Sequence, residues 1–363
     1  MNFFELISKT YITLDSNHRI YIFVLFILLF LSMLLETMSI GLIIPILAII
    51  TDPELFYSYE LIKSNFIEIN HGELIIYTMI ALGVFFIIKT IILAIINFFQ
   101  LKIVWGINVI TAKKLYTKYI RSSYEFHFKN NSSILIRNIV NEVDKFSGSI
   151  NALVNLFSEL IILIGIFILL FYFQPLATIS LLMIFGVSST IFYLFIRNYI
   201  DKWGQARQIH QGRKIQYIQQ GIGAIKDIKI LNRESNFINR FSYHNQRIGI
   251  ISMLENFTTK APRLWLEMIA VMSFAFLVII LVLKDFDSSS LITTLGLFAG
   301  AAFRSLPSIN RIMGSLQGIK FSAPAIKVIN DEILNINFDN KEVSNQEIIS
   351  NIKYLKVDNV SFS

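Results

Sequence analysis

The sequence predicts an all-α membrane protein with six transmembrane helices, long cytoplasmic extensions of those helices, and the first strand of a further domain at its end. Of the 363 residues, 54% are hydrophobic and only 16% are charged, whereas about a quarter of a soluble domain is charged. Apolar residues gather in six runs long enough to cross a hydrocarbon core of about 30 Å. Basic residues concentrate in two of the five connecting segments.

The six apolar runs define the predicted spans. They cover residues 20–50, 74–99, 153–173, 176–196, 264–283 and 291 to about 312. The first run is too long for a signal-peptide core and lacks a small-residue cleavage site, so we expect it to be retained as a span. Residues 52–70 begin with Asp52 and Pro53, a helix cap and first turn, and their apolar face predicts a short helix in the outer interface.

The connecting segments predict the orientation of the chain. Segments 100–149 and 197–263 are rich in Lys and Arg, while the segment 284–290 carries Lys284 alone. The positive-inside rule therefore places both long segments and both termini in the cytoplasm. Proline is scarce in the long segments and apolar residues recur at helical spacing, which predicts helices that continue out of the membrane. This excess of basic loops also explains the net charge of +7 without a nucleic-acid partner.

The C-terminal residues differ in character from the rest. We predict a transmembrane domain over residues 1–330, a polar linker over 331–352, and the start of another domain over 353–363. In the last segment, apolar and polar residues nearly alternate, which is typical of a β-strand. One strand has no core of its own, so we expect it to belong to a truncated domain.

Taken together, the six spans, the cytoplasmic extensions, the linker and the final LKVDNVSFS resemble a half-transporter of the ATP-binding cassette (ABC) exporter family, cut off just inside its nucleotide-binding domain. Two cytoplasmic stretches carry the resemblance. SYEFHFKNNSSILIRNIVNEVDKF is similar to the first coupling-helix region, with Phe126 and Phe128 as its aromatic pair. GIGAIKDIKILNRESNFINRF is similar to the region near the second coupling helix and begins with Gly221 and Ile222. The resemblance implies that these four residues couple the spans to the nucleotide-binding domain.

The resemblance also implies a homodimer whose nucleotide-binding domains bind ATP and Mg²⁺, so the full-length protein is expected to be an ATPase-coupled transporter. This chain contains no Gly-x-x-x-x-Gly-Lys-Ser/Thr loop, so we expect no cofactor site and no ATP hydrolysis in these residues. The histidines lack the spacing of metal ligands. They are His18, His71, His127, His210 and His244. We assign no catalytic residue and no metal ligand.

Within the family, the chain resembles flippases that move lipid-linked oligosaccharides for bacterial protein glycosylation. The residues that carry this likeness are Glu36, Thr37, Pro45, Ala261, Pro262, Arg263, Glu267, Arg304, Pro307, Asn310 and Arg311. The resemblance implies a polyprenyl-pyrophosphate-linked oligosaccharide, or a similar anionic lipid, as the substrate, and the bacterial inner membrane as the location.

Four basic residues form a predicted belt in the inner half of the membrane. Arg304 and Arg311 are seven residues apart and share a helical face, at about 20 and 30 Å below the outer end of the sixth span. Lys89 lies at a similar depth, and Arg263 stands at the mouth of the fifth span. Charges are costly in lipid, so we predict that these cations face a wet cavity and bind phosphate. Alternatively, Arg263 and Arg311 snorkel to headgroups, and Glu267 pairs with Arg263.

Glu36 is a second ionisable residue within a predicted span, about 24 Å from its cytoplasmic end. It pairs with a basic residue of a neighbouring helix, orients a water-lined path, or carries a proton. Two other functions stay open for the whole chain. One is an ABC exporter of a peptide, a drug or a plain lipid, and the other is a membrane scaffold or receptor fragment without a transport cycle.

Overall fold

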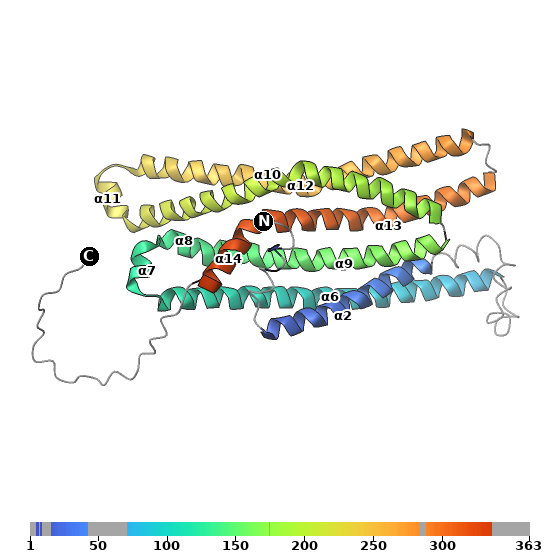
Figure 1. Ribbon diagram of the computed structural model, residues 1–363, viewed down its shortest axis with the longest axis horizontal. Helices are drawn as coiled ribbons and strands as arrows, with labels where there is room; N and C mark the ends of the chain where they lie inside the picture. The colour runs from blue at the N-terminus through green and yellow to red at the C-terminus, as the bar shows by residue number, and fades with distance from the viewer. Residues whose placement is uncertain are drawn as a thin grey trace, which may run out of the picture.

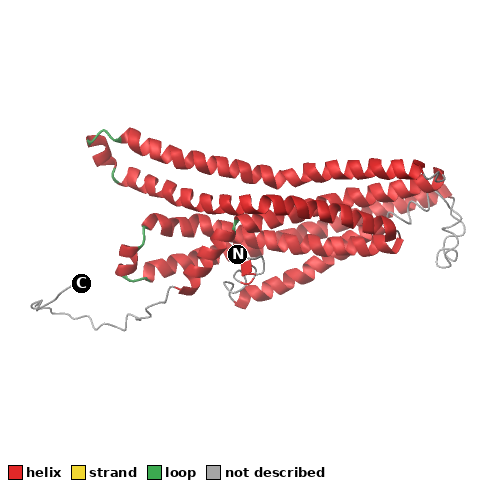
Figure 2. Cartoon of the chain, turned by 45° about the horizontal axis from the view of Figure 1, so that its top comes forward, coloured by secondary structure: helices red, strands yellow, loops and turns green. Residues whose placement is uncertain are grey.

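The structure, a computed structural model, describes residues 5, 6, 8, 16–42, 71–173, 175–283 and 288–335. The helices are α2 Ser16–Gly41, α6 His71–Arg121, α7 Tyr124–Lys129, α8 Ser132–Arg137, the π-helical turn η1 Asn138–Glu142, α9 Val143–Phe173, α10 Pro175–Gly223, α11 Ile225–Ile230, α12 Glu234–Leu283, α13 Ser288–Phe321 and α14 Ala323–Asn335. Within these ranges there is no β-strand (Figure 2). The predicted strand at 353–363 and the predicted outer helix at 52–70 lie outside the described residues.

Helices cover all or part of each of the six predicted spans, so the predicted all-α class is confirmed. By length and composition, three helices of the described residues can cross a membrane: Ile75–Arg121, Ser132–Leu169 and Thr178–Gly223. A shorter apolar helix covers Ile27–Ser39. The full set of six spans stays a prediction. The last helix, α14, runs to Asn335, into the range predicted as linker.

Three helices are much longer than a membrane is thick. Helices α6, α10 and α12 contain 51, 49 and 50 residues, which corresponds to more than about 70 Å at 1.5 Å per residue. Helices α10 and α12 pack side by side, whereas α6 runs along the opposite side of the bundle against α9. The short helices α7 and α11 lie at the same end (Figure 1). These lengths fit the prediction that the spans continue as helices beyond the membrane.

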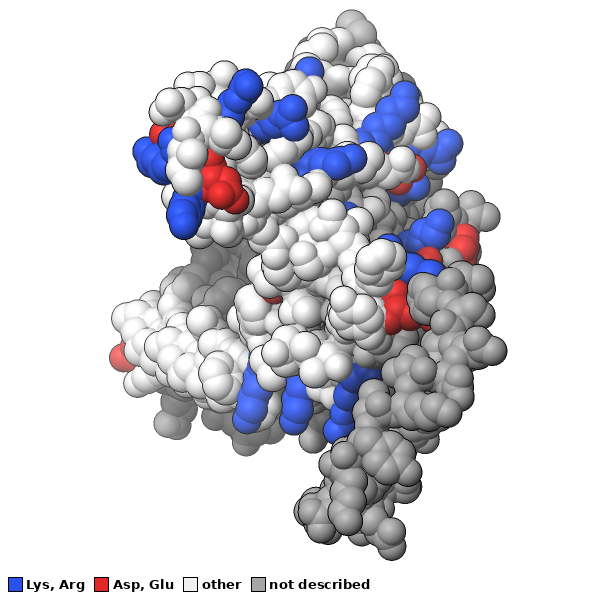
Figure 3. Space-filling model, turned by 90° about the vertical axis from the view of Figure 1, so that its left-hand side faces the viewer, with Lys and Arg blue, Asp and Glu red and all other residues white. Residues whose placement is uncertain are grey.

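The end that carries α7 and α11 displays many Lys and Arg side chains (Figure 3). This is the end that the positive-inside rule assigns to the cytoplasm. Polar caps form the corner at α7. The Ser123 hydroxyl accepts a hydrogen bond from the Phe126 backbone N–H at 3.4 Å, and the Asn131 side chain accepts one from Ser133 N–H at 3.0 Å. These N-caps let the chain turn between α6, α7 and α8.

The main apolar core packs α14 against α6 and α9. Its buried side chains include Leu115, Phe146, Ile326 and Ile329. A second apolar cluster joins α9, α10, α12 and α13 nearer the other end and contains Phe185 and other residues. The two clusters hold the long helices in one bundle and position the polar residues that lie between them.

A pair of histidines links α10 to α12. The Nδ1 atoms of His210 and His244 are 2.8 Å apart, and the Tyr217 ring stacks on His244. Loss of solvent lowers the pKa of His244, and the nearby charges of His210 and Arg213 lower it further. The folded protein therefore favours the neutral imidazole more than the unfolded chain does.

We expect this pair to make stability depend on pH. Because the folded-state pKa of His244 is lowered, the unfolded chain binds more protons once the pH falls below about 6.5, the ordinary pKa of histidine. Its contribution to stability is complete above that pH and is lost on acidification. Melting temperatures of the detergent-solubilised protein at pH 7.5 and pH 5 should differ less for His244→Gln than for the unchanged protein. An equal difference would contradict this prediction.

Candidate functional site

A polar cavity of about 610 Å³, called the inner cavity below, lies between α2, α6, α9 and α13, and Thr259 of α12 also lines it. Five amide side chains line it: Asn97, Gln100, Asn151, Asn155 and Asn310. The Gln100 amide donates hydrogen bonds to Asn151 Oδ1 at 2.9 Å and to Asn155 Oδ1 at 2.7 Å. Amides both donate and accept hydrogen bonds, so this lining suits a ligand rich in hydroxyl groups.

The polar residues of the inner cavity follow helical spacing. On α9, Asn151, Asn155 and Glu159 are four residues apart and share one face. On α6, Asn97 and Gln100 are three residues apart. These residues were not predicted from the sequence. Their signal was a polar stripe on otherwise apolar helices, and Glu159 is the one acidic residue of the third predicted span.

Glu159 and Arg311 form an ion pair at the edge of the inner cavity. Arg311 Nε lies 3.0 Å from Glu159 Oε1. The Glu159 side chain is buried, whereas 55% of the Arg311 side chain is exposed. The guanidinium has five N–H donors, so the pair leaves donors of Arg311 able to bind a ligand.

A neighbouring cavity of about 390 Å³, the side cavity, brings two of the predicted belt residues together. Arg263 and Arg311 both line it, along with Pro307. Asn310 and Arg311 line both cavities and therefore stand between them. The Nε of Arg263 donates to Glu267 Oε1 at 2.8 Å, as the four-residue spacing predicts.

Lys89 is placed differently from the other predicted belt residues. Its ammonium lies 2.8 Å from Glu36 Oε2 and 2.8 Å from Ser39 Oγ, and it lies over the Phe86 ring at 5.0 Å. It lines neither cavity, although Glu36 lines the inner one. The pairing of Glu36 with a basic residue of a neighbouring helix is thus found. A buried ammonium needs such a partner, and a role for Lys89 in binding substrate stays a prediction.

The fourth predicted belt residue, Arg304, is part of helix α13, but the structure does not describe its side chain. Pro45 also lies outside them. The structure therefore brings Arg263 and Arg311 together at the side cavity and connects Lys89 to the inner cavity through Glu36. The role of Arg304 stays a prediction.

The predicted coupling residues divide into partly buried and exposed ones. Phe126, on α7, stacks on Tyr119 with a centroid distance of 5.9 Å, whereas 83% of Phe128 is exposed. Ile222 is 72% exposed, and with Gly221 it lies in the last turn of α10, just before α11. Phe128 and Ile222 are therefore available to a partner at this end of the molecule, while Phe126 anchors α7.

The family model for the ABC transporter transmembrane region matches residues 19–306. The chain belongs to this family. The match includes α7, α11 and most of the cavity residues, and it supports an ABC exporter transmembrane domain. Transmembrane domains of ABC transporters generally pair with nucleotide-binding domains and function as dimers.

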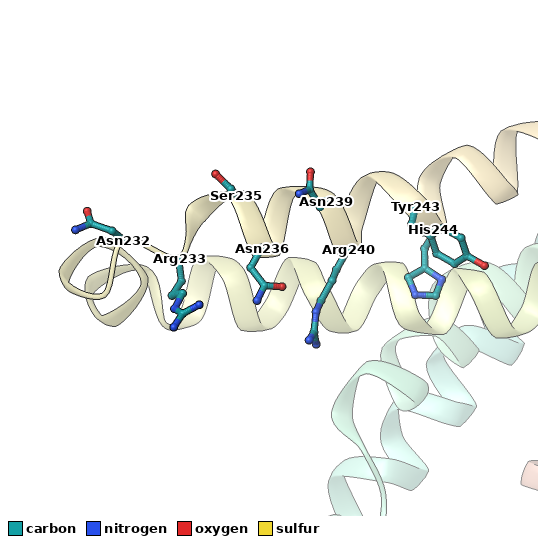
Figure 4. A pocket seen from close by; sticks show the side chains of 8 residues that line it. All are labelled: Asn232, Arg233, Ser235, Asn236, Asn239, Arg240, Tyr243 and His244. Atoms are coloured by element: carbon teal, nitrogen blue, oxygen red, sulfur yellow. The ribbon is translucent and has the colours of Figure 1, made fainter.

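In this ABC transmembrane domain, the start of α12 carries an open pocket of about 570 Å³. Asn236 and Arg240 point to the same side of α12, as their four-residue spacing predicts, and Arg233, just before α12, points to that side as well (Figure 4). Asn232, with a φ of 49°, turns the chain between α11 and α12. Asparagine tolerates this left-handed backbone conformation better than most residues. The pocket extends the polar surface next to α11.

The described part of this ABC domain has no three His, Cys, Asp or Glu side chains close enough together to hold a metal ion. Its polar chemistry is instead that of ion pairs and amides. The inner and side cavities are therefore the candidate substrate site, and α7 and α11 are the candidate contacts for the nucleotide-binding domain.

Proposed function

We propose that this chain is the transmembrane domain of an ATP-driven flippase that moves a polyprenyl-pyrophosphate-linked oligosaccharide, or a similar lipid, across the bacterial inner membrane. The observation that carries the proposal is the inner cavity, where five amides and Arg311 lie among apolar helices. Amides match the hydroxyls of a glycan, and a guanidinium matches a phosphate. In this proposal the chain is multi-pass, and both termini are cytoplasmic.

Arg311 is the residue best placed to bind the pyrophosphate. It is half exposed, lines both cavities, and is bonded to Glu159 through Nε. Its terminal nitrogens can offer a planar fork to phosphate oxygens while Nε stays paired. Arg263 lines the same side cavity from α12, so the two guanidiniums can contact one headgroup. Arg304 and Lys89 complete the proposed site.

The partners in this proposal are a second copy of the chain and the nucleotide-binding domains. Beyond the predicted second span, α6 exposes Trp105, Val109, Tyr116 and Ile120 along its length. Apolar residues exposed outside the hydrocarbon core favour a protein partner, which supports a homodimer. We propose that the nucleotide-binding domains bind ATP and Mg²⁺ and contact Phe128 and Ile222, and that ATP drives the cycle by binding the closed dimer more tightly than the open one.

One observation favours a second candidate, an exporter of a peptide, a drug or a plain lipid. Each described belt cation is already paired with a carboxylate: Lys89 with Glu36, Arg263 with Glu267, and Arg311 with Glu159. These pairs reduce the net positive charge that an anionic headgroup would meet. Tighter binding of a neutral amphiphile than of a pyrophosphate-linked lipid would favour this candidate.

We expect Arg311→Ala to reduce transport of a pyrophosphate-linked lipid by about tenfold or more, since a hydrogen bond to a charged group contributes about 1.5–3 kcal/mol. Transport is measured in proteoliposomes containing the transporter assembled with its nucleotide-binding domains. Arg311→Lys keeps the charge without the fork and should be intermediate. Unchanged transport by Arg311→Ala would contradict the site.

Arg197→Ala is a matched control, because Arg197 is exposed on α10 and lines neither cavity. We expect it to transport normally. Arg304→Ala belongs in the same assay, and unchanged transport would remove that arginine from the mechanism. Absence of any ATP-dependent transport in the unchanged protein would favour a scaffold or receptor instead.

A further inference from the structure

Asn138, the first residue of the π-helical turn, joins two helices that are far apart in the sequence. Its side chain is almost completely buried. The Nδ2 atom donates hydrogen bonds to the Tyr119 hydroxyl at 3.1 Å and to Glu332 Oε1 at 3.2 Å. Its Oδ1 accepts one from Arg137 at 2.7 Å. An amide nitrogen carries two hydrogens, so α6 and α14 are held by the same side chain.

Tyr119 extends this connection to α7. Its ring stacks on Phe126 at an interplanar angle of 23°, and its backbone carbonyl accepts a hydrogen bond from His127 Nε2 at 2.8 Å. Direct contacts therefore run from α7 through Tyr119 and Asn138 to Glu332 on α14. We call Tyr119, Asn138 and Glu332 the α7–α14 junction.

A second bond fixes the end of α14. Lys118 Nζ donates to the Ile333 carbonyl at 2.7 Å. Burial raises the pKa of the Glu332 carboxyl, while a hydrogen bond from Tyr119 and the charges of Lys118 and Arg137 oppose that rise. These neighbours thus offset part of the cost of burying the Glu332 carboxylate. The surrounding apolar residues hold α14 in place, but the directional hydrogen bonds define its orientation.

The two helices joined in this way, α7 and α14, lie where the domain is expected to meet its partners. Helix α7 is a candidate contact for the nucleotide-binding domain, and α14 is the last helix that the structure describes. Both lie toward the same end of the bundle (Figure 1). Pro324, near the start of α14, has no N–H to continue the hydrogen bonding of α13, so α14 follows a turn at Ser322 and takes its own direction.

We propose that the α7–α14 junction is a positioning cluster that makes the coupling helix and the last helix move as one body. A displacement of α7 then also displaces α14 and the long helices, instead of only bending the connection between α6 and α7. This inference rests on the proposed ATP-driven transport, and it assigns Asn138, Tyr119 and Glu332 to coupling rather than to substrate binding.

The first test compares transport with ATP hydrolysis in the assembled transporter. Glu332→Ala should lower the number of substrate molecules moved per ATP by about fivefold while ATPase activity persists. Glu332→Gln keeps a carbonyl that can accept from Asn138, so it should restore most of the coupling. Equal losses of transport and ATPase activity, with an unchanged ratio, would mean that the residue only supports folding and would overturn the proposal.

The second test measures the junction itself and does not depend on transport. The chain has no cysteine, so spin labels can be attached at K129C on α7 and K327C on α14, both at exposed positions. In the assembled transporter, we expect a narrow distance distribution that broadens with Glu332→Ala or Asn138→Ala. Glu234→Ala, which removes a partly exposed partner of Lys229 at α11, should leave the distribution narrow.

These two measurements separate the two ideas. If the unchanged protein shows no ATP-driven transport, the proposed function fails, yet the distance distribution still tests the junction. A distribution that is equally narrow with Glu332→Ala would overturn the junction even if transport occurs. Broadening together with a lower coupling ratio supports both.

Discussion

Replacing Arg207 with methionine should destabilise the domain by about 3–5 kcal/mol, the cost of leaving one partner of a buried ion pair alone. Glu142 is completely buried in the π-helical turn, and Arg207 Nη2 donates to its Oε2 at 2.9 Å. Arg137 lies farther away, with Nε 3.7 Å from the other carboxylate oxygen. Arg207→Met therefore leaves a buried carboxylate with one weaker partner. Denaturant or thermal unfolding of the detergent-solubilised protein measures the loss.

A second variant tests the cause of that loss. Adding Glu142→Gln to Arg207→Met removes the unpaired charge, so the double variant should be more stable than Arg207→Met alone. Lys129→Ala is the control, because its ion pair with Glu125 is exposed, and exposed pairs contribute little. If Arg207→Met unfolds at the same temperature as Lys129→Ala, Arg207 is not needed to compensate Glu142.

Local sequence patterns predicted the class of the fold well. The apolar runs place helices at every predicted span, and the helical spacing in the basic segments predicts that α6, α10 and α12 continue beyond the membrane. These features could be predicted because they depend only on residues that are close together in the sequence of one helix. Helix α14 continues to Asn335, past residue 330, after which the linker was predicted. A polar surface on a packed helix resembles a linker when the core beneath it is unknown.

The candidate site depended on contacts between helices, and much of it could not be predicted. Glu36 and Lys89 are 53 residues apart, so the sequence alone could not identify them as partners. The opposite placements of Phe126 and Phe128 could have been predicted, because side chains at positions i and i+2 of a helix point about 200° apart. The spacing of Asn151, Asn155 and Glu159 was also visible, but only packing shows that this face meets α6 and α13 around a cavity.

A close helix contact at Gly204 provides the second large expected effect. A Cβ atom on Gly204 would lie too close to the Phe321 carbonyl oxygen and 3.3 Å from its carbon, both of which are backbone atoms. Phe321 is the last residue of α13, and its buried ring lies under the charged ends of Lys145 and Arg207. Neither the backbone nor this ring can move without disturbing the contact between α10 and the start of α14.

We therefore expect Gly204→Ala to destabilise the domain by about 1–3 kcal/mol through overpacking, even though alanine is the better helix former by about 1 kcal/mol. Gly249→Ala is the matched control. Gly249 lies on α12 with nothing within 4 Å of an added Cβ, so that change should be neutral or slightly stabilising. Unfolding of both variants in the same detergent gives the comparison. If Gly204→Ala is as stable as Gly249→Ala, α10 does not approach the Phe321 backbone this closely, because two backbones in contact leave no room for a methyl group.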